Sequence, residues 1–155
     1  MTIEIRILNT ADERMLDNVA SGVFDKPINH DWTAEFLADP RHHLVVAIED
    51  GQVIGMATAV NYVNPDKPSE LWINEVGVAL AHQRRGIGRQ LMSAMLAHGR
   101  ALGCKEAWVF TDTGNTAARR LYAAAGGQED SRDTPVMVTF KLADIAADLK
   151  ALDSE

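Results

Sequence analysis

The stretch Gln83-Arg84-Arg85-Gly86-Ile87-Gly88-Arg89 decides the fold expected of this chain. A predicted strand over residues 71–78 precedes it, and apolar side chains recur at helical spacing over residues 87–102 after it. The stretch is therefore expected to join a strand to a helix. At such a junction, free backbone N–H groups and the positive end of the helix dipole converge. Its glycines let a ligand approach the backbone and its arginines add positive charge, so the sequence predicts a phosphate-binding site.

The composition fits one globular domain, expected to cover residues 1–155, with 46% hydrophobic and 24% charged residues. The net charge of -7 argues against nucleic acid or an anionic membrane as a partner, because both require neutralised phosphates. Residues 1–8 alternate like a strand and resemble no leader, and no apolar run is long enough for a membrane span. Cys104 is the only cysteine and no metal-ligand spacing is present, so we expect a cytoplasmic protein without a metal.

The rest of the chain predicts a mixed α/β pattern around one central sheet. The expected strands cover residues 3–7, 44–49, 53–63, 71–78, 107–111 and 136–142. The expected helices cover residues 10–23, 32–38, 87–102, 115–125 and 143–152. Thr10 and Glu13 suggest a capping box, and residues 50–52 suggest a hairpin turn. Residues 41–43 are predicted to be a loop that could form the lip of a substrate site.

Two segments together resemble a known family. Gln83-x-x-Gly86-x-Gly88, with residues 74–78 before it and a helix after it, resembles the acetyl-CoA signature of the GNAT-type N-acetyltransferases. Residues 115–126, with Ala118, Leu121, Tyr122 and Gly126, resemble that family's second signature. The resemblance implies the GNAT-like acyl-CoA N-acyltransferase fold, an α/β (α+β) fold. Its central sheet is mixed but mostly antiparallel, with splayed central strands and helices on both faces.

The resemblance also implies an acetyl-CoA site, with acetyl-CoA serving as acetyl donor and no metal. The pantetheine arm would lie between the splayed strands, and the pyrophosphate would lie on the glycine loop. The residues implied to bind acetyl-CoA are Val76, Gly77, Val78, Gln83, Arg84, Arg85, Gly86, Ile87, Gly88, Arg89, Asn115, Ala118 and Tyr122.

Direct acetyl transfer from a thioester to an amine requires a neutral amine, a stabilised oxyanion and a proton for the thiolate. We expect Glu75 to be the general base, directly or through a water, and Tyr122 to serve the departing sulfur. The backbone N–H of Val76 or Val78 is a candidate oxyanion donor. Glu75 could instead pair with a cation at a sheet edge, and Tyr122 could instead be an aromatic anchor beneath the cofactor.

The sequence defines the acceptor amine less closely than the acetyl donor. Residues 72–78, Asp112 and residues 136–140 most resemble the aminoglycoside 3-N-acetyltransferase branch, although an aspartate is usual there at the place of Glu75. The candidate acceptor-binding carboxylates are Glu75, Asp112, Glu129 and Asp130. The last three could also be solvated loop charges. A small-molecule amine is the leading substrate; a protein N-terminus or lysine, and a CoA-binding module without turnover, stay open. A homodimer is possible within the family.

Overall fold

The computed structural model of the protein describes residues 2–130 and 135–143. Within these residues, one sheet has the strand order β1-β2-β3-β4-β5. The strands are β1 (Glu4–Ile7), β2 (His42–Glu49), β3 (Gln52–Tyr62), β4 (Glu70–Val78) and β5 (Glu106–Trp108). The helical elements are η1 (Thr10–Asp17), α1 (His30–Ala38), η2 (Leu80–His82), α2 (Ile87–Ala101) and α3 (Thr116–Ala124), where η marks a 3-10 helix.

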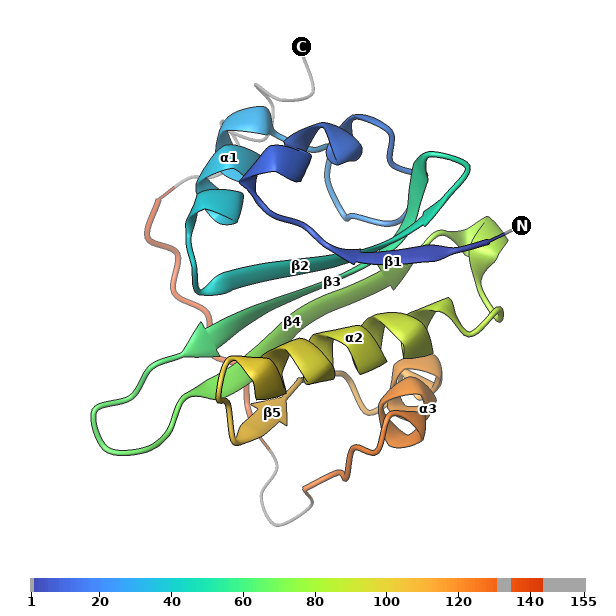
Figure 1. Cartoon of the computed structure of the whole chain (residues 1–155). Helices are drawn as coiled ribbons and strands as arrows, with labels where there is room; N and C mark the ends of the chain where they lie inside the picture. The colour runs from blue at the N-terminus through green and yellow to red at the C-terminus, as the bar shows by residue number, and fades with distance from the viewer. Residues whose placement is uncertain (1, 131–134, 144–155) are drawn as a thin grey trace.

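The helices cover both faces of this sheet. In Figure 1, α1 and the N-terminal 3-10 helix lie above the strands, while α2 and α3 lie below them. Strands β1 to β4 pair antiparallel, and β4 pairs with β5 in parallel. The expected mixed, mostly antiparallel sheet with helices on both faces is confirmed.

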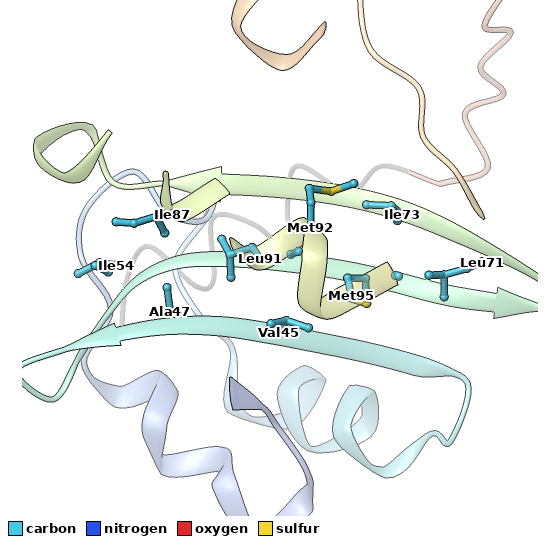
Figure 2. Close-up of a cluster of buried hydrophobic side chains, with 11 residues drawn as sticks. Val45, Ala47, Ile54, Leu71, Ile73, Ile87, Leu91, Met92 and Met95 are labelled. Carbon is cyan, nitrogen blue, oxygen red and sulfur yellow. The ribbon is translucent and has the colours of Figure 1, made fainter. Parts of the chain in front are cut away.

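Each face has its own hydrophobic cluster. Below the sheet, α2 inserts Ile87, Leu91 and Met95, each no more than 1% exposed, against inward side chains of β2, β3 and β4 (Figure 2). Above the sheet, the cluster joins Leu16 and Val23 to the opposite side chains of β2 and β3. Strands β2 and β3 contribute side chains to both clusters, because successive side chains of a strand point to opposite faces.

Strand β4 leaves its parallel neighbour soon after pairing begins. The ladder joins Glu70, Leu71 and Trp72 to residues 106–108, whereas β4 continues to Val78. Beyond Trp72, this edge of β4 therefore lacks β5 as a neighbour, which agrees with the expected splayed strands. The predicted strand at residues 107–111 is shorter than expected, and Phe110 is 65% exposed.

The first helical segment differs from the prediction. Its cap is Asn9, which accepts from the Ala11 N–H at 2.9 Å, while Asp12 accepts from the Asn9 N–H at 3.0 Å. The Thr10–Glu13 capping box was therefore wrong by one residue. The segment ends at Asp17 because the next residues bond to β3, with the Ala20 N–H donating to the Val53 carbonyl at 2.8 Å.

Two further expectations were wrong. Residues 42 and 43 belong to β2 and form no loop; His43 is 7% exposed and bonds to Asn61 and His98, so it is no substrate lip. Residues 136–142 form no strand, and Phe140 is 78% exposed. Their alternation suits a strand, but a strand also needs a neighbour for its backbone groups. The predicted helix at residues 143–152 lies almost wholly outside the described residues.

The other predicted elements agree with the structure to within about two residues, and α1 starts at His30, capped by Asn29. Asp50 and Gly51, with φ of 51° and 75°, form the hairpin turn between β2 and β3. Among the described helices, none combines the length and apolar character needed to cross a membrane.

Candidate active site

The glycine loop connects β4 to α2 through the short helix η2. Gly86 is the N-cap residue of α2 with a φ of 77°, and the first helical bond runs from the Gln90 N–H to the Gly86 carbonyl at 3.1 Å. The N–H groups of residues 87–89 therefore precede the ladder of helical bonds. Arg84 has a φ of 63°, which is unusual for a side chain with a Cβ. The loop thus has a defined shape and presents main-chain donors at a helix start, as an anion site requires.

Glycine is required at positions 86 and 88 of the loop for different structural reasons. Gly86 adopts the left-handed conformation that disfavours a Cβ, and open space surrounds the position that a Cβ would take. A Cβ on Gly88 would lie 3.2 Å from the Leu121 side chain. Gly88 therefore allows α2 to pack closely on α3, and its small size also serves the core.

Arg85 is held by a residue that the sequence reading missed. Its guanidinium donates to both carboxylate oxygens of Glu49, from Nη1 to Oε1 at 3.2 Å and from Nη2 to Oε2 at 2.6 Å. Glu49 is buried at the end of β2, and its hydrogen bonds from Arg85 lower the pKa of its carboxyl. His82 Nε2 lies 3.7 Å from Glu49 Oε1. This Glu49–Arg85 brace ties the loop to the sheet, and 36 residues of sequence separation hid it.

The strand part of the predicted donor site contributes side chains to the core. Val76 and Val78 pack against the lower hydrophobic cluster, and the Val78 carbonyl accepts from Gln83 Nε2 at 3.1 Å. Ile87 is 1% exposed, so its side chain belongs to the core and does not reach a ligand. A Cβ on Gly77 would overlap the Val23 carbonyl oxygen, so glycine is needed there for packing.

Helix α3 packs against α2 below the sheet (Figure 1) and carries the remaining predicted donor residues. Beyond the Trp72–Trp108 pair the strands β4 and β5 part, and this opening is called the β4–β5 fork. Asn115 Oδ1 accepts from the Ala118 N–H at 3.1 Å and so caps the helix. Tyr122 lines a cavity of about 270 Å³ together with Leu71 and Trp108. Burial raises the pKa of the Tyr122 hydroxyl, which keeps it protonated as a proton donor must be.

Glu75 faces a second cavity, of about 280 Å³, on the opposite face of β4. A register shift opposite Thr58 and Ala59 interrupts the alternation of β4, so that Ile73 pairs with Ala59 and Glu75 with Thr58. Although the Glu75 residue is exposed overall, partial burial raises the pKa of its carboxyl, and the nearby Asp25 charge raises it further. Asp25 lines the same cavity and was not predicted. Its position in an irregular loop gives no sequence signal.

The remaining predicted carboxylates precede or follow α3 in the chain. Glu129 accepts two hydrogen bonds from Arg119, at 2.7 and 2.9 Å, which lower the pKa of the Glu129 carboxyl. The Asp112 carbonyl accepts from the Asn115 N–H at 3.0 Å, and Asp130 follows Glu129 at an exposed position. Of the predicted acceptor carboxylates, Glu75 is the one that lines the second cavity in the described part of the chain.

Known proteins similar to this chain include acetyltransferases, in agreement with the fold. Residues 9–126 match the Acetyltransferase (GNAT) family, and the chain belongs to that family. It is 37% identical over 92 residues, 59% of its length, to N-alpha-acetyltransferase RimI of Mycobacterium tuberculosis. It is 31% identical over 91 residues, 56% of its length, to aminoglycoside N(6')-acetyltransferase type 1 of Salmonella typhimurium.

The matched segments span 56% and 63% of the length of these relatives. The fold also resembles that of AAC(6')-Iy in complex with the bisubstrate analogue CoA-S-monomethyl-acetylneamine, with a TM-score of 0.73 and 23% identity over 90% of this chain and 100% of that chain. The aminoglycoside relatives named here carry the 6' designation. The expected resemblance to the 3-N branch is therefore not confirmed.

Proposed function

We propose that this chain transfers the acetyl group of acetyl-CoA to a primary amine of a small molecule that binds in the Glu75 cavity. The single observation that carries the proposal is the position of Glu75. Its carboxyl has a raised pKa and lines a cavity beside the open edge of β4. An aminoglycoside, predicted from the sequence, is one candidate acceptor, and the similarity to a RimI protein makes a polypeptide N-terminus a second.

The donor side fits the chemistry of a diphosphate. The N–H groups at the start of α2 would bind it, together with the side chains of Arg84 and Arg89, because both are exposed beside the same helix start. The guanidinium of Arg85 already donates to Glu49, so we assign Arg85 chiefly to holding the loop. Acetyl-CoA would supply the acetyl group as a thioester.

The proposed proton transfers use one residue from each cavity. Glu75 would accept the proton that the amine loses, and Tyr122 would donate one to the departing sulfur. Because Glu75 and Tyr122 line separate cavities, the thioester would have to lie between them, at the edge of β4 that lacks a neighbour beyond Trp72. The net reaction forms an amide C–N bond and breaks the C–S bond, and proton exchange with solvent restores both residues.

The test combines binding and turnover. Calorimetry with CoA should show one binding site, and release of CoA thiol should follow addition of an amine from a panel. A chain that binds no CoA, or binds it unchanged after Gly86→Val, would contradict the donor site. Binding without turnover by any amine would favour a CoA-binding module.

A further inference from the structure

The walls of the Glu75 cavity are mainly apolar. Trp32 and Phe36 project from α1, Phe24 comes from the preceding loop, and Trp32 remains 52% exposed. The aliphatic residues that complete the lining are Leu16, Pro27, Ile28 and Leu44. A half-exposed tryptophan at the edge of an apolar cavity is suited to cover the apolar part of a ligand.

Two of the six polar residues of the lining, Asn29 and Thr33, are engaged in hydrogen bonds within the protein. Asn29 Oδ1 accepts from the Trp32 N–H at 2.9 Å, and Thr33 Oγ1 donates to the Asn29 carbonyl at 2.8 Å. Both bonds belong to the start of α1. These two side chains therefore have reduced capacity to bond the hydroxyl groups of a ligand.

The charges of the cavity suit one ammonium group. Asp25 and Glu75 are the acidic side chains of the lining, and Lys26 adds a positive charge beside them. Asp25 and Glu75 line the same cavity, and the charge of Asp25 raises the pKa of the Glu75 carboxyl. One cation would relieve their repulsion, whereas a ligand with four or five ammonium groups would also face Lys26.

The cavity of about 280 Å³ has room for a single ring or a branched alkyl group beside Glu75. It shares Leu16, Phe24 and residues 25–28 with an adjoining hollow of about 550 Å³.

We infer that the acceptor is a primary amine whose nitrogen is joined by a short link to a compact apolar or aromatic group, with Asp25 and Glu75 at the nitrogen and Trp32 against the apolar group. This inference rests on the proposed function and specifies its substrate class. A free arylalkylamine and a peptide beginning with an aromatic residue share this chemistry.

The experiment measures CoA thiol release with 2-phenylethylamine, 1,4-diaminobutane, kanamycin A and short peptides beginning with Phe or Ser. We expect kcat/KM for 2-phenylethylamine to exceed the values for diaminobutane and kanamycin A at least about tenfold, the effect of burying part of one apolar side chain. The Phe peptide should exceed the Ser peptide if peptides enter the site. The ratio of the free amine to the Phe peptide identifies the natural form of the acceptor.

Variants of the aromatic wall make the test specific. Trp32→Ala should lower kcat/KM for 2-phenylethylamine by about tenfold and leave diaminobutane nearly unaffected, because only the aromatic ligand contacts the indole. Trp32→Phe should restore most of the loss. Tyr62→Ala is the matched control, since Tyr62 is 51% exposed and does not line the cavity.

The outcomes separate the inference from the proposed function. CoA binding, measured by calorimetry, should be the same in wild type, Trp32→Ala and Tyr62→Ala. Equal or better turnover of kanamycin A, or an equal loss for all amines in Trp32→Ala, would overturn the substrate class. A failure of the wild-type chain to bind CoA, or CoA binding without turnover of any amine, would instead overturn the proposed function.

Discussion

Glu75 carries the acid–base chemistry in this proposal, and its neighbour Asp25 offers a sharp test of it. The Asp25 charge helps to raise the pKa of the Glu75 carboxyl. Removing that charge in Asp25→Asn should lower the pKa, so the acidic limb of the kcat–pH profile should move to lower pH. Glu75→Gln should lower kcat by about 10²–10⁴-fold, the usual contribution of a general base. The profile would be measured by CoA thiol release from pH 4.5 to 8.

Asp31→Asn is a suitable control for this prediction, because Asp31 is exposed on α1 and does not line the cavity. An acidic limb that stays in place in Asp25→Asn, or a Glu75→Gln variant with the wild-type rate, would remove Glu75 from the mechanism.

Gly77 links the proposed donor strand to the loop that forms the acceptor cavity. Because a Cβ there would overlap the Val23 carbonyl oxygen, Gly77→Ala should destabilise the fold by about 1–3 kcal/mol, as overpacking usually does. Gly114→Ala is the control, since nothing lies within 4 Å of the added Cβ. Urea unfolding of both variants measures the difference in the free energy of unfolding. Equal midpoints would show that the loop containing Val23 shifts without loss of stability.

At the scale of elements, the Glu49–Arg85 brace joins the end of β2 to the start of α2. Glu49→Gln removes the charge that holds Arg85, so the loop should lose its fixed shape. We expect KM for acetyl-CoA to rise about tenfold or more with kcat within about twofold, as expected when donor binding alone is weakened. Glu49→Asp should recover part of the loss.

Steady-state kinetics and calorimetry with CoA measure this effect of the brace. Asp50→Asn is the control, because it removes the same charge from the next residue, and asparagine tolerates the φ of 51° found there. A KM in Glu49→Gln equal to that of the control would show that the loop keeps its shape unaided.

At the scale of the whole molecule, a histidine pair connects α2 to the sheet. His98 Nε2 lies 2.9 Å from His43 Nδ1, and His43 Nε2 lies 2.8 Å from Asn61 Oδ1. Burial, and then the His43 charge, lower the pKa of His98 below its ordinary 6.5. The folded chain therefore binds fewer protons than the unfolded chain, so stability should fall as the pH drops below about 6.5, by at most about 1.4 kcal/mol per pH unit per proton.

Urea unfolding at pH 7.5 and 5.5 measures this dependence. His98→Phe should reduce the loss of stability between the two pH values, whereas His30→Gln, at an exposed position, should leave it unchanged. The same loss in His98→Phe as in wild type would place the pH dependence elsewhere.

The sequence predicted those parts of this molecule that local patterns determine. Apolar periodicity located α2, and the glycine loop was found because its residues are contiguous. The Glu49–Arg85 brace, the His43–His98 pair and the Asp25 contribution were missed, because each joins residues far apart in the chain. The strand expected over residues 136–142 failed for a related reason, since alternation describes a strand but does not supply its neighbour.

The β4–β5 fork contains two stacked tryptophans whose optical signal can be measured without attaching a dye. Trp72 and Trp108 stack where the strands part, with ring centroids 5.2 Å apart and planes 14° from parallel, and Trp108 Nε1 donates to Glu70 Oε2 at 3.1 Å. Indoles this close couple their electronic transitions, so the pair should give an exciton band in circular dichroism. A molecule that spreads the strands would alter that band, so circular dichroism would report whether a ligand lies between β4 and β5.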